Sequence, residues 1–232
     1  MKVVILAGGL GTRISEYTKV IPKPMVNISG KPIILHIMKH FAKYGHREFF
    51  IAVGYKGDVI KKFFRKNKFG WNVNIIETGK KTMTGGRIKR LKTILKNERF
   101  FLTYGDGISN VNLNALLSFH KSKKSSVTLT AVRPTSRFGV IKIKNSKVSY
   151  FKEKSRLDES WINGGFFVFK KEIFKFLGKG NEMLERSPMI KLSKKKQLVG
   201  YKHKGFWQCM DTPRDKEFLK KLLRENNAPW KN

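Results

Sequence analysis

The stretch "KVVILAGGLGTRI", residues 2–14, decides the fold: an apolar run ends in a turn that holds three glycines and an arginine. The run is typical of a buried strand. The glycines can bring backbone amides close to an anion, with Arg13 as a fork-shaped phosphate donor. Ile14 stands where a dinucleotide-binding G-x-G-x-x-G motif needs its third glycine, and the P-loop motif G-x-x-x-x-G-K-[ST] is absent. The turn therefore fits another kind of phosphate loop, or a sharp strand-to-helix corner.

Apolar runs rich in valine, isoleucine and phenylalanine recur along the first part of the chain. Such runs are typical of buried strands, and the segments between them show helical periodicity. This alternation predicts an α/β fold with a mostly parallel central sheet and helices on both faces. The predicted strands are residues 2–6, 48–53, 72–77, 100–104 and 127–132, and the predicted helices are residues 33–44, 58–66, 87–95 and 113–122.

The pattern changes after residue 133. The run "FGVIKIKNSKVSYFKEK", residues 138–154, holds two alternating stretches around a polar turn and predicts a β-hairpin. A further strand is predicted at "GGFFVFK", residues 164–170, and a helix at Thr212, which is followed by a proline and then an aspartate at the third position. We find no repeat or linker, so we expect a single domain over residues 1–232 with a small β-rich insertion.

The composition favours a polyanionic partner. The chain has 232 residues, with 50 Lys and Arg against 16 Asp and Glu, a formal net charge of +34. Because the basic residues are spread almost evenly, whereas a nucleic-acid-binding module clusters them, we expect no nucleic acid partner. No apolar stretch is long enough for a membrane span, so we expect no membrane partner. The single cysteine, Cys209, cannot form an internal disulfide, which is typical of a cytoplasmic protein.

Lys23 is held between two prolines in "IPKPM", residues 21–25. Each proline fixes its own backbone and biases the residue before it towards an extended form, so the lysine lies on a stiff segment. That suits a cation that must meet a phosphate in one place. The more common alternative is an ordinary solvated loop.

Two aspartates are candidate ligands for a divalent cation. Asp106 follows a predicted strand, at the end where open α/β sheets bind ligands, and the segment after it looks helical. Asp211 directly precedes the helix predicted at Thr212. Hard cations such as Mg²⁺ take carboxylate and phosphate oxygens. With Arg13 and Lys23, these residues are the parts of phosphoryl-type transfer. The alternatives are an Asp-Gly turn and an aspartate favoured by the helix dipole.

Weaker signals come from two glycine pairs, in "MTGGR", residues 83–87, and in "INGGF", residues 162–166. Both fit tight turns, or a binding crevice that Arg87 and Asn163 line together with Asp106. We interpret His36, His40 and Cys209 as ordinary core or surface side chains, because no metal-binding or nucleophile motif surrounds them.

Six stretches, in this order along nearly the whole chain, resemble the sugar nucleotidylyltransferases: "LAGGLGTR", "PKPM", "TYGDG", "RFG", "NGGFF" and "GFWQCMDTPRDK". Within that family, "MTGGR", "GFWQ" and "APWK" resemble the members that use CTP and glucose 1-phosphate. The resemblance implies a Rossmann-like nucleotidyltransferase fold. It also implies a Mg²⁺-dependent reaction in which the phosphate oxygen of α-D-glucose 1-phosphate attacks the α-phosphorus of CTP in line, giving CDP-glucose and pyrophosphate.

The same resemblance implies the roles of individual residues. Arg13, Lys23, Asp106 and Asp211 are the expected catalytic residues, and the two aspartates are the expected Mg²⁺ ligands. The expected nucleotide-binding residues are Leu6, Ala7, Gly8, Gly9, Leu10, Gly11, Thr12, Arg13, Lys23, Thr82, Arg87 and Gly105. The expected sugar-phosphate-binding residues are Glu153, Lys154, Asn163 and Gly164.

The chain departs from the family pattern at three places. Between Phe64 and Asn72 it has a short basic connection where relatives carry a longer segment that contributes subunit contacts and part of the nucleotide region, and Ser155 and Cys209 replace prolines. The implied assembly is a homo-oligomer. Two alternatives stay open: the same chemistry with UTP or dTTP, and, from a different class, a basic nucleic-acid-binding protein.

Overall fold

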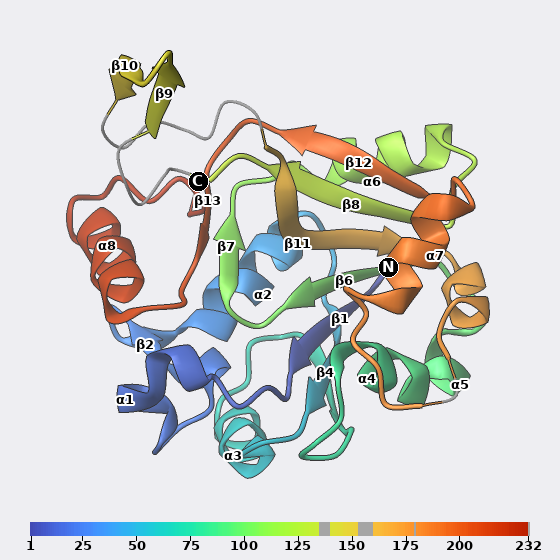
Figure 1. Ribbon diagram of the computed structural model, residues 1–232. Coiled ribbons are helices and arrows are strands. Elements are labelled where there is room, and N and C mark those ends of the chain that lie inside the picture. The colour runs from blue at the N-terminus through green and yellow to red at the C-terminus, as the bar shows by residue number, and fades with distance from the viewer. Residues whose placement is uncertain (135–139, 153–159, 179, 232) are drawn as a thin grey trace.

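The computed structural model describes residues 1–134, 140–152, 160–178 and 180–231. Its centre is a seven-stranded sheet in the order β12-β8-β11-β6-β1-β4-β5 (Figure 1). The five strands predicted in the first part of the chain are confirmed, and so is the strand predicted around residue 165. The strands of this sheet are β1 (Lys2–Ala7), β4 (Glu48–Val53), β5 (Asn72–Glu77), β6 (Phe100–Tyr104), β8 (Val127–Val132), β11 (Ile162–Phe169) and β12 (Leu198–His203).

The sheet is mostly parallel, as predicted. Strand β1 pairs in parallel with both β4 and β6, β4 with β5, and β12 with β8, whereas β11 runs antiparallel to its neighbours β6 and β8. The carboxyl ends of β1, β4 and β6 therefore meet at one edge of the sheet, with Leu6 opposite Tyr104 and Ala7 opposite Val53. The loops that follow these three strands therefore lie next to one another at this edge of the sheet.

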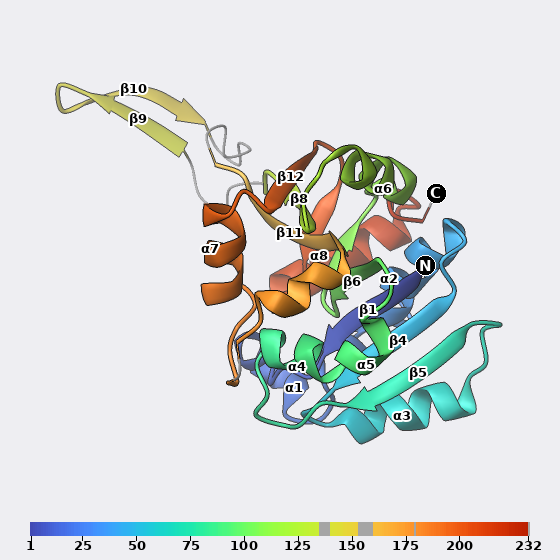
Figure 2. The same cartoon turned by 90° about the vertical axis from the view of Figure 1, so that its right-hand side faces the viewer.

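Helices cover both faces of the sheet (Figure 2). Successive residues of β1 point to opposite faces: Ile5 packs in one apolar cluster and Val4 in the other. The first face is covered by α2 (Ile33–Lys43), α3 (Gly57–Lys66), α6 (Leu113–Ser122) and α8 (Pro213–Arg224). The second is covered by α4 (Thr84–Arg90), α5 (Lys92–Leu95) and α7 (Ser187–Lys194).

The helix predicted over residues 87–95 is wrong in its bounds, because the structure has two short helices there. Helix α4 begins at Thr84 and is separated from α5 by Leu91. The glycines that suggested a tight turn lie inside α4. A Cβ on Gly85 would be 2.9 Å from the carbonyl oxygen of Glu182, so the glycine allows another segment to lie directly against the helix. This close approach is a tertiary contact that no local pattern reveals.

Short elements complete the molecule. The predicted hairpin is confirmed: β9 (Val140–Lys144) and β10 (Lys147–Lys152) pair antiparallel and extend away from the body of the molecule (Figure 2). None of the helices among the described residues has the length and apolar character that crossing a membrane requires. The other short elements are the 3₁₀ helices η1 (Thr12–Ile14), η2 (Lys23–Met25) and η3 (Lys171–Lys175), helix α1 (Ser15–Thr18), and strands β2 (Asn27–Ile28), β3 (Lys31–Pro32), β7 (Gly107–Ser109) and β13 (Trp207–Cys209).

Candidate active site

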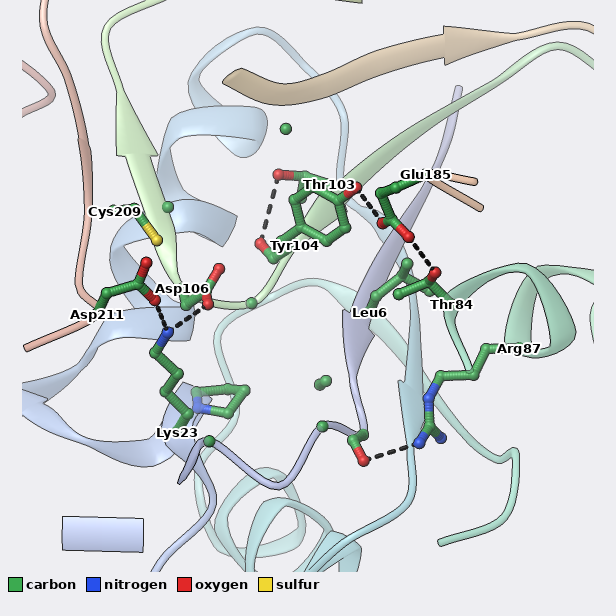
Figure 3. Close-up of a pocket in the computed structure, with 18 of the residues that line it drawn as sticks. Leu6, Lys23, Thr84, Arg87, Thr103, Tyr104, Asp106, Glu185, Cys209 and Asp211 are labelled. Carbon is green, nitrogen blue, oxygen red and sulfur yellow. Dashed lines mark hydrogen bonds and ion pairs between the residues drawn. The ribbon is translucent and has the colours of Figure 1, made fainter. Parts of the chain in front are cut away.

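A pocket of about 570 Å³ opens at the carboxyl ends of β1 and β6 (Figure 3). Except for Leu10, every site residue predicted from the sequence that the structure describes lines this pocket. Leu10 lies in the same loop with its side chain exposed to solvent. The predicted sugar-phosphate contacts Glu153 and Lys154 lie outside the described residues. Segments from seven parts of the chain meet here, and their lining residues lie within 6–13, 23–24, 82–87, 103–107, 163–165, 183–185 and 207–211.

The loop after β1 is held in shape by its glycines. Gly11 has a left-handed backbone (φ +67°), and a Cβ there would lie 2.7 Å from a methyl carbon of Thr18. The Thr18 hydroxyl in turn donates a hydrogen bond of 3.0 Å to the Gly11 carbonyl. Ile14, which replaces the third glycine of a dinucleotide motif, is buried in the core. The loop therefore turns back onto the body of the protein directly after Arg13.

Lys23 lies at the centre of an ion cluster. Its ammonium donates to Oδ2 of Asp106 at 2.6 Å and to Oδ1 of Asp211 at 2.5 Å, and an Arg13 guanidinium nitrogen lies 2.6 Å from the other Asp211 oxygen. The Lys23 side chain is only 9% exposed, whereas that of Arg13 is 72% exposed. Two cations and two anions thus meet on one wall of the pocket. Pro24 packs directly against Gly105. This contact holds the stiff "PKP" segment in place, and with it the backbone of Lys23.

The charges of this cluster outweigh the effect of burial. Burial alone would lower the pKa of Lys23, but the charge of Asp106 and the hydrogen bonds to both carboxylates raise it above its ordinary value. Burial would likewise raise the pKa of Asp211, yet the hydrogen bond and charge of Lys23, together with the charge of Arg13, hold it below its ordinary value. Both groups are therefore charged at neutral pH.

Backbone hydrogen bonds position the two aspartates. The sequence-based expectation of a helix directly after Asp106 is wrong: strand β7 comes first and pairs antiparallel with β13. The amide of Met210 donates to the Asp106 carbonyl at 2.9 Å, which places Asp211 beside Asp106. On the other side, Asp215 accepts hydrogen bonds from the amides of Asp211 and Thr212. The predicted cap of α8, with Thr212 and Asp215 bonded reciprocally, is confirmed.

Arg87 is buried and bonded to backbone carbonyls. Its guanidinium donates to the carbonyls of Gly8 (2.7 Å), Val53 (3.0 Å) and Gly79 (3.0 Å) and to the hydroxyl of Thr78 (2.6 Å). A Cβ on Gly8 would overlap this guanidinium. Arg87 thus ties the loop after β1 to the ends of two further strands, a contact that sequence reasoning missed.

Glu185 is a second pocket residue that sequence reasoning missed. One carboxylate oxygen accepts from the Tyr104 hydroxyl at 2.5 Å and the other from the Thr84 hydroxyl at 2.6 Å. Burial, followed by the charge of Glu185, raises the pKa of Tyr104, so its hydroxyl stays protonated. Glu185 lies in the segment before α7, in a stretch without a motif, so no local signal could have found it.

The carboxylate pair fits a divalent cation. Ligand atoms of Asp106, Asp211 and Cys209 all lie within 4.8 Å of one another. Burial, followed by the charge of Asp106, raises the pKa of the Cys209 thiol, so the thiol is protonated in the chain without a metal. Hard cations prefer the oxygens of the two carboxylates. Lys23 and Arg13 line the same pocket of about 570 Å³, in which a bound phosphate group could supply further oxygens.

Comparison with known proteins agrees with this geometry. A family described as nucleotidyl transferase matches residues 2–213 of the chain. The chain belongs to this family of enzymes. A curated relative from Salmonella typhimurium, named glucose-1-phosphate cytidylyltransferase, is 42% identical to this chain. The alignment is 254 positions long and covers 100% of this chain and 99% of the relative.

Solved structures have the same fold. HddC from Yersinia pseudotuberculosis, in complex with GMP-PN, is 26% identical with a TM-score of 0.75, covering 96% of this chain and 99% of that chain. The inositol-1-phosphate CTP transferase from T. maritima is 18% identical with a TM-score of 0.74, covering 100% of this chain and 96% of that chain, and shows the fold alone.

Proposed function

We propose that the chain transfers CMP from CTP to α-D-glucose 1-phosphate, giving CDP-glucose and pyrophosphate. The observation that carries this proposal is the cluster of Lys23, Arg13, Asp106 and Asp211 in a pocket at the end of β1. The full-length similarity to the glucose-1-phosphate cytidylyltransferase of Salmonella typhimurium supports the choice of substrates.

The proposed reaction needs charge neutralisation more than proton transfer. The attacking atom is a phosphate oxygen of glucose 1-phosphate that already carries negative charge. It forms a bond to the α-phosphorus of CTP, and the bond between the α- and β-phosphates breaks, with its electron pair leaving on pyrophosphate. Two anions must therefore approach each other, and preset cations lower the barrier. This accounts for a pocket wall that offers Lys23 and Arg13.

The two cations suit different parts of this task. Lys23 is buried and fixed by its flanking prolines, so it holds a positive charge at one place. Arg13 is exposed, so its guanidinium can turn from Asp211 to a phosphate group as the nucleotide enters. We propose that Asp106 and Asp211 hold Mg²⁺, which supplies further neutralisation of the triphosphate when bound.

We propose that the other predicted residues also contact the substrates. The backbone amides of the glycine loop from Leu6 to Arg13 would lie along the triphosphate, and Thr82, Arg87 and Gly105 would lie around the cytidine. Arg87 acts chiefly by fixing the Gly8 carbonyl in this interpretation, because its donors are already bonded to the backbone. Asn163 and Gly164 would contact glucose 1-phosphate, together with Glu153 and Lys154.

Pyrophosphate release by the purified chain tests the function. Mg²⁺ and glucose 1-phosphate are supplied with CTP, UTP, dTTP or ATP in separate reactions. We expect rapid release with CTP. Release with UTP or dTTP instead would support the alternative base, and no release with any nucleotide would overturn the proposal. Strongly salt-dependent DNA binding without turnover would favour a nucleic-acid-binding protein.

We also propose that the chain forms a homo-oligomer through the hairpin β9–β10. Its register places Ile143 opposite Val148 and Ile141 opposite Phe151, so these four side chains share one face, and they are 48–67% exposed. Large exposed apolar patches are typical of interaction sites.

Sedimentation velocity tests the assembly. Replacing Ile143 and Val148 together by lysine should reduce the size of the assembly, whereas Lys144→Ser on the opposite face should not. A monomeric parent chain would contradict the proposal. The cytoplasmic location expected from the single cysteine stays a prediction.

A further inference from the structure

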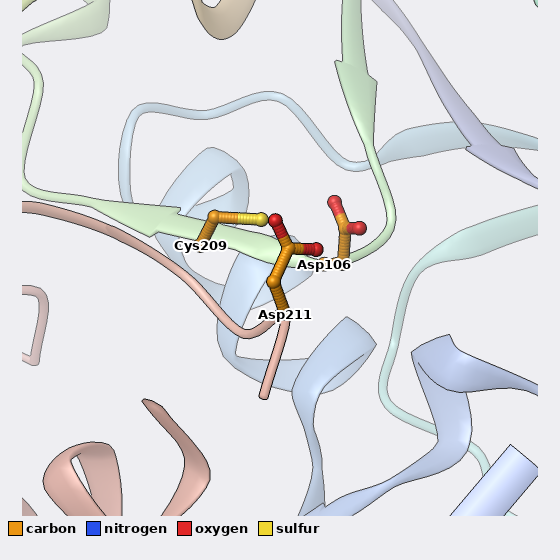
Figure 4. Close-up of side chains that lie close together, drawn as sticks. All are labelled: Asp106, Cys209 and Asp211. Carbon is orange, nitrogen blue, oxygen red and sulfur yellow. The ribbon is translucent and has the colours of Figure 1, made fainter. Parts of the chain in front are cut away.

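The thiol of Cys209 faces the carboxylates of Asp106 and Asp211 and has no part in the proposed reaction (Figure 4). Its sulfur and one oxygen of each carboxylate lie within 4.8 Å of one another. All three residues line the pocket. Cys209 is the only cysteine in the chain.

The backbone brings these three side chains together. Strand β13 pairs with β7 so that Cys209 lies opposite Gly107, next to Asp106 in the chain. The amide of Met210 donates to the Asp106 carbonyl at 2.9 Å. In extended backbone, alternate side chains share a face. Accordingly the Met210 side chain is fully buried in the core, while the residues on either side of it, Cys209 and Asp211, line the pocket.

We propose that Cys209, Asp106 and Asp211 form a mixed sulfur and oxygen site that binds a thiophilic divalent cation, such as Zn²⁺ or Co²⁺, in the chain without substrate. The proposal rests on the carboxylate pair of the proposed function. Mg²⁺ takes oxygen ligands and completes its shell with water or phosphate, so Cys209 is of no use to it. Zn²⁺ and Co²⁺ bind thiolate, carboxylate and imidazole alike.

The geometry is close to what such a cation requires. Around a tetrahedral cation with metal–sulfur and metal–oxygen distances of about 2.3 and 2.1 Å, neighbouring ligand atoms lie roughly 3.4–3.6 Å apart. The three ligand atoms already lie within 4.8 Å of one another. Side-chain rotations that move these atoms by about an ångström would therefore bring them to the distances that the cation requires. As the metal–sulfur bond forms, the thiol proton passes to solvent, one proton for each metal ion bound.

Lys23 opposes any cation at this place, because its ammonium is already bonded to both carboxylates. A metal ion must displace it. With two carboxylates alone, Mg²⁺ has little advantage over the lysine until substrate phosphates join. A thiolate adds a third protein ligand and a third negative charge, which offsets the loss of Lys23. The free chain should therefore distinguish thiophilic cations from Mg²⁺.

Cobalt absorption tests the site in the full chain freed of metal. Co²⁺ bound to a thiolate gives a charge-transfer band in the near ultraviolet, and the single cysteine assigns that band without ambiguity. We expect one Co²⁺ per chain, with the band lost when Zn²⁺ displaces it and kept in a large excess of Mg²⁺. Cys209→Ser should abolish the band and weaken Zn²⁺ binding at least about tenfold, and Asp106→Asn should weaken both.

Glu185→Gln is the matched control, because Glu185 is an acid of the same pocket bonded instead to Tyr104 and Thr84. It should keep the band. Thermal melting of each metal-free variant checks folding. Binding of Co²⁺ without the band, or a band that needs two chains for each cobalt, would overturn the proposal. A band without nucleotide turnover would overturn only the proposed function, and turnover without a band would overturn only this site.

Discussion

The ammonium of Lys23 lies 2.6 Å from Oδ2 of Asp106, a residue 83 positions later in the chain. Because the lysine is buried and its two carboxylate partners are preset by backbone hydrogen bonds, the cation cannot move far. Its charge is balanced in the chain without ligands. In the reaction we propose, an entering polyphosphate would compete with the carboxylates for the same ammonium, so that substrate binding would be linked to the release of both aspartates.

Lys23→Ala should lower kcat/KM for pyrophosphate formation by about 10²–10³, or roughly 3–4 kcal/mol. The loss follows from removing a buried cation from the approach of two anions. Lys19→Ala, which removes an exposed lysine nearby, is the control and should change little. Melting curves of the two variants separate lost chemistry from lost folding. Full activity in a folded Lys23→Ala variant would remove this residue from the mechanism.

Two glycines of one loop should behave differently. Gly11→Ala forces a side chain into a left-handed backbone and against Thr18, so we expect a loss of about 1–3 kcal/mol in the free energy of unfolding. Gly9→Ala meets no atom within 4 Å, so its stability should stay within about 0.5 kcal/mol of the parent. Because Gly9 lines the pocket, its added methyl group should instead raise the KM for the nucleotide by about tenfold.

Urea unfolding and nucleotide saturation curves measure both glycine effects. Equal destabilisation by the two substitutions would show that the loop tolerates no side chain at all. A stable Gly11→Ala variant would show that the loop relaxes around the left-handed position.

Arg87→Lys should destabilise the fold by roughly 3 kcal/mol, because an ammonium cannot replace a fork that donates to Gly8, Val53 and Gly79. Lys92→Ala, on the neighbouring helix, is the control. Chemical denaturation measures the difference. A change under about 0.5 kcal/mol would contradict the bonding role of Arg87.

Acid should destabilise the protein through its buried histidines. Burial, only partly offset by a hydrogen bond to the Val111 carbonyl, lowers the pKa of His40 to about 4, while in the unfolded chain it stays near 6.5. Above about pH 6.5 the histidine is neutral in both states. As the pH falls below that value, the unfolded chain takes up the proton first. Stability therefore decreases from about pH 6.5 down to about pH 4.

At pH 5 the contribution of His40 to this loss is about 2 kcal/mol relative to pH 7.5. His40→Gln should flatten the change in urea midpoint between the two pH values, although it is less stable than the parent at pH 7.5. An unchanged pH dependence in this variant would assign the acid sensitivity to other groups.

Much of the fold could be predicted because its signals are local. The runs that became β1, β4 and β6 are apolar and bounded by glycine or polar residues, and the cap of α8 is a pattern of four residues. The sequence pattern starts this helix at residue 87, whereas α4 begins at Thr84. The reason is that Gly85 by itself disfavours a helix and is accepted here because another segment packs closely against it. Local propensity holds no information about that neighbour.

The candidate site divides in the same way. Short sequence motifs predicted four of its residues from their chemistry, namely Gly11, Lys23, Asp106 and Asp211. The bonds from Arg87 to the carbonyls and the position of Glu185 depend on segments about 80 to 180 residues away from the loop after β1. Nor did any motif reveal that Cys209 faces two carboxylates.

The sequence by itself determined six of the seven strands of the sheet, all except β12, together with where α8 begins and which charged side chains follow β1 and β6. Hydrophobic period, capping and turn chemistry act over a few residues, so they can be read locally. The tertiary structure alone decided that Lys23 meets Asp106 and Asp211, that Arg87 fastens the glycine loop, and that Cys209 joins the carboxylates. These contacts depend on strand order and on the pairing of β7 with β13, which long-range packing selects.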